Sequence, residues 1–168
     1  MKKFLRKVAV FVAVILALTL LPAYLIDPYN VMHWDNIRDN GVEPNKNYIK
    51  TQYIIENPDK FEGYILGSSR VGSLHVEKIT GERLYNMTYS GGIPANHVET
   101  LQAFLDNGVT VKSIYMGVDN ISYTFSPADY TGTPLRASWQ ELQSMDTFFN
   151  IYMNPKMNIQ SLEVMSVR

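Results

Sequence analysis

The chain contains no cysteine, and this absence excludes several kinds of chemistry at once. Without a thiol there is no disulfide bond, no thiolate nucleophile and no cysteine-ligated zinc site. A basic surface is also lacking. Four of the 15 basic residues precede Val8, so 11 basic and 16 acidic residues follow, a net charge of −5. Nucleic acid, which needs a basic face, is therefore not an expected partner.

Charge is missing altogether from one long run, Val8 to Ile26. At 1.5 Å per residue this run makes a helix of about 28 Å, close to the thickness of a bilayer hydrocarbon core. Cationic residues precede it (Lys2, Lys3, Arg6 and Lys7) and Asp27 follows it. By the positive-inside rule, the N-terminus lies in the cytoplasm and the rest of the chain outside. We expect a single-pass anchor in the cell membrane, held by the lipid bilayer; a cleaved signal peptide is the alternative.

The rest of the chain has the composition of a folded domain. Hydrophobic residues make up 46% of the sequence and aromatic residues 12%, which is enough to bury a core. We divide the chain into a cytoplasmic tip and transmembrane anchor (1–26), a polar connector (27–46) and one α/β domain (47–168).

Helical and strand-like segments alternate after residue 46. Spacing and end signals predict helices over 47–56, 74–80 and 94–107, and a helical stretch over 135–152. Apolar runs predict strands over 61–66, 83–88 and 111–116. Helices between strands indicate a parallel sheet with helices on its faces, a three-layer flavodoxin-like α/β fold behind the N-terminal transmembrane helix.

Small and polar residues follow each predicted strand. They are Gly67-Ser68-Ser69-Arg70, then Gly91 and Gly92, then Asp119 and Asn120. Ligands bind at the carboxyl edge of open parallel sheets, and a helix starting after Ser69 points its free N–H groups there. Ser69 is therefore the candidate nucleophile, with a glycine N–H and an amide side chain to hold an oxyanion. The alternative is that Ser69 is a plain helix N-cap.

Four segments together resemble the membrane-anchored relatives of the SGNH/GDSL hydrolases, of the DltD type that acts on cell-envelope polymers. They are Asp27-Pro28-Tyr29-Asn30, Gly67-Ser68-Ser69-Arg70, Tyr85-Asn86-Met87-Thr88 with Gly91-Gly92, and Gly117-Val118-Asp119-Asn120.

The resemblance implies an SGNH-type sheet with Ser69 as the nucleophile. It also implies that Gly91 or Gly92 donates a backbone N–H to the oxyanion and that Asn120 completes the hole, with Asp119 at the family's usual asparagine position. The implied partners are a cell-envelope polymer or acyl donor and a membrane protein. No cofactor and no metal ion are implied.

One family feature is missing, because the chain has no Asp-x-x-His motif to supply a general base. Its three histidines are His33, His75 and His97. We expect His75 to be a surface residue and His33 to have no catalytic role. His97, in the first turn of a predicted helix near Gly91-Gly92, is the nearest substitute base.

The length suggests an explanation, since a domain of this type has two further βα units after its third strand. We expect a truncated gene product or a fragment, and a short natural variant that binds a partner through its uncovered sheet edge is the alternative. Two functions therefore stand: an extracytoplasmic acyl hydrolase or acyltransferase that is incomplete here, and a catalytically silent, membrane-tethered interaction module.

Overall fold

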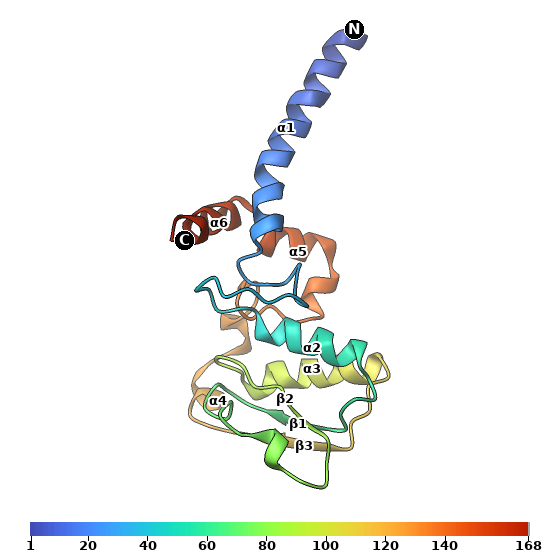
Figure 1. Cartoon of the computed structure of the whole chain (residues 1–168), viewed down its shortest axis with the longest axis vertical. Helices are drawn as coiled ribbons and strands as arrows, with labels where there is room; N and C mark the ends of the chain where they lie inside the picture. The colour runs from blue at the N-terminus through green and yellow to red at the C-terminus, as the bar shows by residue number, and fades with distance from the viewer. Residues whose placement is uncertain (168) are drawn as a thin grey trace.

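A single long helix projects from the body of the protein in the computed structural model, which describes residues 1–167 (Figure 1). This helix, α1 (Lys2–Ile26), is long and apolar enough to cross a membrane. Only Ala23, near its end, is buried. The expected apolar N-terminal helix is therefore confirmed, and its side chains have no protein core to pack into over most of its length.

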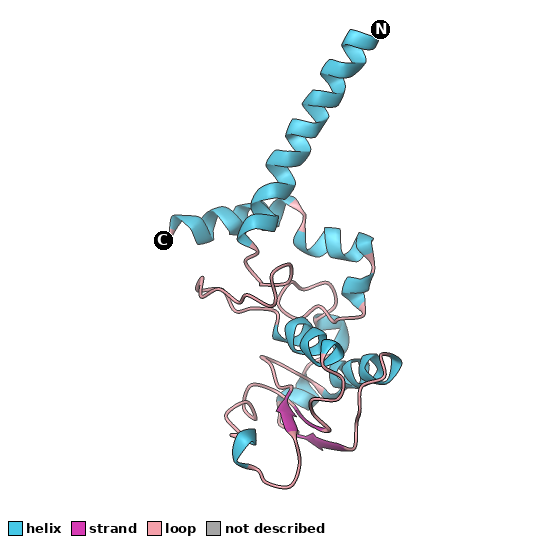
Figure 2. Ribbon diagram, turned by 45° about the vertical axis from the view of Figure 1, so that its right-hand side comes forward, coloured by secondary structure: helices cyan, strands magenta, loops and turns pink. Residues whose placement is uncertain are grey.

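The sheet has three parallel strands, as the sequence predicts. They are β1 (Gly63–Leu66), β2 (Leu84–Asn86) and β3 (Ser113–Met116), in the order β2-β1-β3. Gly63 is in register with Leu84 on one side and with Ser113 on the other. All three carboxyl ends therefore lie at the same edge of the sheet (Figure 2).

Two helices, α2 (Lys46–Glu56) and α3 (Pro94–Asp106), cover one face of this sheet. Tyr64 and Leu66 are two residues apart in β1, so both point to that face, where they are fully buried with Phe104 of α3. The rings of Tyr64 and Phe104 lie 4.9 Å apart. Pro94 opens α3, where its missing N–H costs nothing. Both predicted helices are confirmed.

The opposite face of the sheet differs from the expected third layer. The predicted helix over 74–80 is wrong, because the chain forms only a short 3₁₀ turn, η1 (Val76–Lys78). No side chain of residues 71–80 is buried, so packing does not offset the cost of nucleating a helix. Among the described residues, an apolar groove of about 560 Å³ stays open here, lined by Leu74, Ile114 and other residues.

A second core lies at the foot of α1. Ala23 packs there with Tyr152 of α5 (Met145–Tyr152) and Met157 of α6 (Pro155–Ser166). The predicted helical stretch over 135–152 is only partly helical, and α6 was not predicted. The remaining elements are short: α4 (Ile121–Thr124), η2 (Pro127–Asp129) and η3 (Glu141–Gln143).

The connector is folded into this second core. Asp27 is 2% exposed, and its carboxylate accepts the backbone N–H groups of residues 31, 32 and 33 at 2.8–2.9 Å. Val31 is buried in the same cluster as Ala23. Three charge-assisted hydrogen bonds fix the chain direction at the end of α1, so the domain is held close to the helix.

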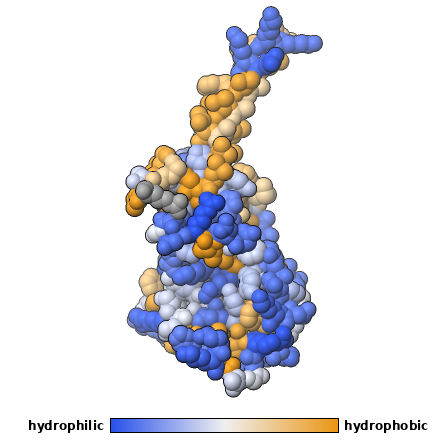
Figure 3. Space-filling model, viewed as in Figure 1, coloured by the Kyte–Doolittle hydropathy of each residue, from blue (hydrophilic) through white to orange (hydrophobic). Residues whose placement is uncertain are grey.

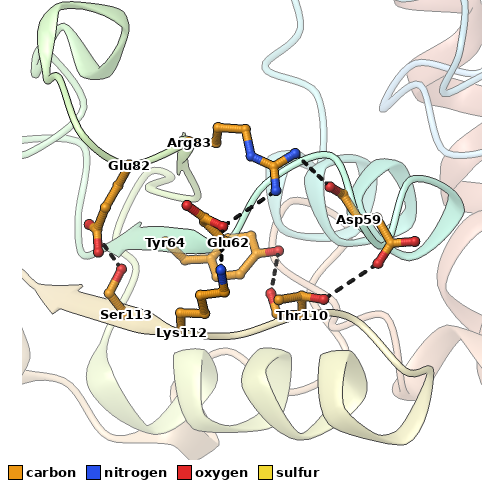
Figure 4. A network of polar contacts seen from close by, with 8 residues as sticks. All are labelled: Asp59, Glu62, Tyr64, Glu82, Arg83, Thr110, Lys112 and Ser113. Carbon is orange, nitrogen blue, oxygen red and sulfur yellow. Dashed lines mark hydrogen bonds and ion pairs between the residues drawn. The ribbon is translucent and has the colours of Figure 1, made fainter.

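Figure 4 shows a polar network at the amino ends of the strands. Glu62 accepts hydrogen bonds from Lys112 at 2.8 Å and from Arg83 at 3.4 Å, while Glu82 accepts one from Ser113 at 3.1 Å. These charges satisfy one another across the three strands. The candidate site lies at the other end of the sheet.

Candidate functional site

Three glycines bring the loops after β1, β2 and β3 into contact. A Cβ on Gly92 would lie 2.6 Å from the carbonyl oxygen of Gly67, and a Cβ on Gly67 would lie 2.8 Å from that of Gly117. Gly67 also has a φ of +145°, a conformation that side chains disfavour. Backbones this close require glycine, so the expected convergence of the three clusters at one edge rests on these positions.

The two adjacent serines have different environments. Ser68 is 1% exposed, and its hydroxyl donates to Asp119 Oδ2 at 2.5 Å. Ser69 is exposed and lines a cleft of about 540 Å³. Ser68 therefore ties the β1 loop to the β3 loop, and Ser69 is the serine that a ligand can reach. No helix begins after Ser69, because residues 70–73 form turns, so the expected helix N-terminus is not present at this hydroxyl.

The side chain of Arg70 also contacts the loop after β3. Its Nη1 donates to Asn120 Oδ1, and its Nε lies 3.9 Å from Asp119 Oδ2. The hydrogen bond from Ser68 is the main cause of a lowered pKa at Asp119. The Asp119 carboxylate is thus engaged in a structural contact, and the carbonyl end of Asn120 is turned toward Arg70.

The two glycines of the β2 loop are not equivalent. The N–H of Gly92 donates to the carbonyl of Tyr89 at 3.1 Å, which closes a turn. Gly91 has a φ of +71° and lies under the guanidinium of Arg136, whose Nε donates to the Ser90 carbonyl at 2.8 Å. Since the Gly92 N–H is engaged, Gly91 is the remaining candidate donor to an oxyanion, and neither glycine is among the residues that line the cleft with Ser69.

His97 is fully buried and faces the backbone of Gly67 instead of Ser69. Its Nε2 accepts the Gly67 N–H at 2.9 Å, and its ring lies 5.0 Å from that of Tyr89. Burial lowers its pKa from 6.5 to about 4, because a charged imidazolium would lose its hydration. A base must reach the proton it removes. The role considered for His97 from the sequence is therefore replaced by a structural one.

A lysine that the sequence reading missed lies in the same cleft as Ser69. Lys50 of α2 donates to the carbonyls of Asn86 and Thr88 at 2.8 and 2.6 Å. Its pKa is lowered to about 8, mainly by burial and secondly by the positive charge of Lys46. The sequence held one signal, because Lys50 falls four residues before buried Ile54 and so faces inward.

The other histidines lie away from the cleft. His75 is exposed and contacts Glu77, as expected of a surface residue. His33 lies beside Asp27 in the second core, with its Nδ1 3.3 Å from the carboxylate. Within residues 1–167, no three His, Asp or Glu side chains gather as a metal ion needs.

Comparison of the chain with protein-family models, with curated proteins and with solved structures finds no match. The function proposed below therefore rests on the geometry and chemistry of the site. That site combines an accessible hydroxyl, a glycine-lined loop junction and a partly desolvated cation at the carboxyl edge of a parallel sheet.

Proposed function

We propose that the chain is a membrane-anchored, extracytoplasmic module of the SGNH acyl hydrolase or acyltransferase type, in which Ser69 accepts the acyl group. One observation supports this most. Of the two serines after β1, the one that the family resemblance assigns as nucleophile is the one exposed in the cleft, while its neighbour is buried against Asp119. The cationic first turns of α1 support placing the domain outside the cell.

The chemistry follows from the groups in the cleft. The Ser69 Oγ attacks the acyl carbonyl carbon while a base takes its proton. The tetrahedral intermediate then expels the donor's alkoxide, which recovers that proton, and leaves an ester on Ser69. Water or an acceptor hydroxyl of an envelope polymer reverses these steps. The Lys50 cation lines the cleft with Ser69 and offers stabilisation to the developing negative charge, and the resemblance assigns a backbone N–H of the β2 loop, that of Gly91, to the same charge.

A general base for Ser69 is not supplied by the described histidines, because His97 is engaged with Gly67 and both His33 and His75 lie elsewhere. General-base assistance is worth about 10²–10⁴-fold in rate. We therefore expect little esterase turnover from these residues alone, and Ser69-dependent turnover in a longer chain that carries an Asp-x-x-His segment.

Added imidazole tests the proposal directly, because it can act as a diffusible base. The full chain in detergent micelles is assayed on a short-chain acyl ester with increasing imidazole, beside Ser69→Ala. The matched control is Ser73→Ala, which removes another exposed serine of the same loop. We expect an imidazole-dependent rate, and an acetyl adduct on the Ser69 peptide by mass spectrometry, in wild type and Ser73→Ala only.

An equal imidazole response in wild type and Ser69→Ala, with no adduct, would refute the nucleophile. The second candidate would then stand, a catalytically silent tethered module that binds envelope machinery. The open apolar groove beside Leu74 and Ile114 is the observation that favours it.

A further inference from the structure

Helix α6 meets α1 at the end that is next to the domain. Met157 of α6 shares a buried cluster with Ala23, and Val164 and Met165 line a small cavity of about 160 Å³ with Leu25 and Ile26. Figures 1 and 2, which are turned by 45°, both show α6 running across the axis of α1. If α1 is perpendicular to a membrane, α6 lies along its surface.

The level of α6 matches the boundary of the bilayer. Counting from Val8, α1 extends about 28 Å by Ile26, which is the thickness of the hydrocarbon core. Polar groups begin directly below, since Asp27 follows and Arg38 donates to the carbonyl of Leu25 at 3.1 Å. Figure 3 shows hydrophobic residues along α1 below its charged tip and more of them beside its lower end.

The polar side of α6 faces the domain. Gln160 donates to the Tyr29 hydroxyl at 3.2 Å. Gln160 and Glu163 also line a cavity of about 270 Å³ with Pro28 and other connector residues. These contacts determine the rotation of the helix, because residues three apart share a face.

The side of α6 away from the domain carries three uncovered apolar side chains, beside the smaller polar residues Asn158 and Ser166. Ile159, Leu162 and Met165 are 59%, 55% and 53% exposed. Their spacing of three places them along one side of the helix, away from buried Met157 and Val164. In water these apolar side chains would be exposed to solvent. Leu21 and Leu25 of α1, both more than half exposed, lie at the same height, where a bilayer around α1 would be the nearest apolar medium.

We propose that α6 is an interfacial helix whose Ile159, Leu162 and Met165 side chains enter the headgroup and acyl boundary of the membrane that α1 crosses. The inference rests on the membrane anchoring contained in the proposed function. The exposed apolar side chains of α6 lie next to those of α1, and its polar side chains Gln160 and Glu163 face the domain, which is the arrangement of a helix in a membrane interface. The helix then fixes the height and tilt at which the Ser69 cleft stands above the lipid.

The absence of cysteine makes a clean experiment available. Single-cysteine variants Leu162→Cys and Ile159→Cys carry an environment-sensitive fluorophore, and the full chain is reconstituted into vesicles of equal parts phosphatidylcholine and phosphatidylglycerol. Some vesicles contain lipid with a doxyl quencher near the headgroup end of its acyl chain. Gln160→Cys is the control on the domain side of α6, and Val98→Cys, 62% exposed on α3, is the control in water.

We expect blue-shifted emission and several-fold stronger lipid quenching at positions 162 and 159 than at 160 and 98. Quenching at 162 no stronger than at 98 would overturn the inference, and so would a blue shift that the lipid quencher leaves unchanged, which indicates a protein partner. Leu21→Cys, 52% exposed and near the outer end of α1, lies closer to the depth of the quencher and separates the two failures. If it is quenched and 162 is not, only the interfacial helix is wrong; if neither is quenched, the anchoring itself is wrong.

Discussion

The buried neutral imidazole of His97 makes a quantitative prediction about acid stability. Nε2 of His97 accepts the N–H of Gly67 at 2.9 Å and also lies 3.1 Å from the Gly67 carbonyl oxygen. That carbonyl favours the imidazolium, but burial opposes it more strongly, because the charged ring would lose its hydration. The folded protein therefore resists protonation of His97, whereas the unfolded chain does not.

The sign and size follow from the two pKa values. The pKa of His97 falls from 6.5 in the unfolded chain to about 4 in the folded protein. Between these values the unfolded state binds a proton that the folded state does not, so stability declines as the pH falls through this window. At 1.36 kcal/mol per pKa unit, the full loss is about 3 kcal/mol, and it is complete once the pH reaches the folded value.

The assay is urea unfolding of the full chain in detergent micelles, followed by tryptophan fluorescence across this pH window. His97→Gln keeps an acceptor for Gly67 and removes the titration, so its stability should fall by about 3 kcal/mol less than that of wild type. Carboxylates titrate in both proteins and cancel in the comparison. His75→Gln changes an exposed histidine and should follow wild type. Equal losses in wild type and His97→Gln would refute the reasoning.

Three further predictions test the site and the topology. Ser68→Ala should raise the pKa of Asp119 in a carboxylate NMR titration and lower the melting temperature, because the carboxylate loses its hydroxyl donor, while Ser69→Ala should change neither. Gly92→Ala should cost about 1–3 kcal/mol of unfolding free energy, since the new Cβ would meet the Gly67 carbonyl; unchanged urea unfolding would contradict the close approach. Protease added to intact cells should digest the domain, and protection until lysis would contradict the orientation of α1.

Local patterns were enough to predict the elements whose own sequence decides them. The apolar run of α1, the apolar strands, the inward spacing along α2 and the Pro94 start of α3 each depend on neighbouring residues in the chain. The parallel direction of the strands also followed, because helical segments between strands indicate crossover connections, whereas the order β2-β1-β3 came only from the structure. The candidate hydroxyl of Ser69 could be chosen from its position after β1.

Tertiary structure decided which partner each polar group has. Ser68 and Ser69 are neighbouring residues of the same type. Ser68 is buried because its hydroxyl donates to Asp119, 51 residues away, whereas Ser69 stays accessible. His97 looked usable as a base until its ring was seen to face Gly67, 30 residues away. The segment over 74–80 forms no α-helix because none of its side chains is buried against the rest of the protein.

The sequence by itself therefore determined the apolar N-terminal helix, the strands and the glycine-rich ends of the strands, since each is set by interactions between near neighbours. The structure alone decided the carbonyl partners of Lys50, the folding of the connector around Asp27 and the rotation of α6. Those features depend on contacts between residues far apart in the chain, whose free energy appears only when the surrounding backbone is already in place.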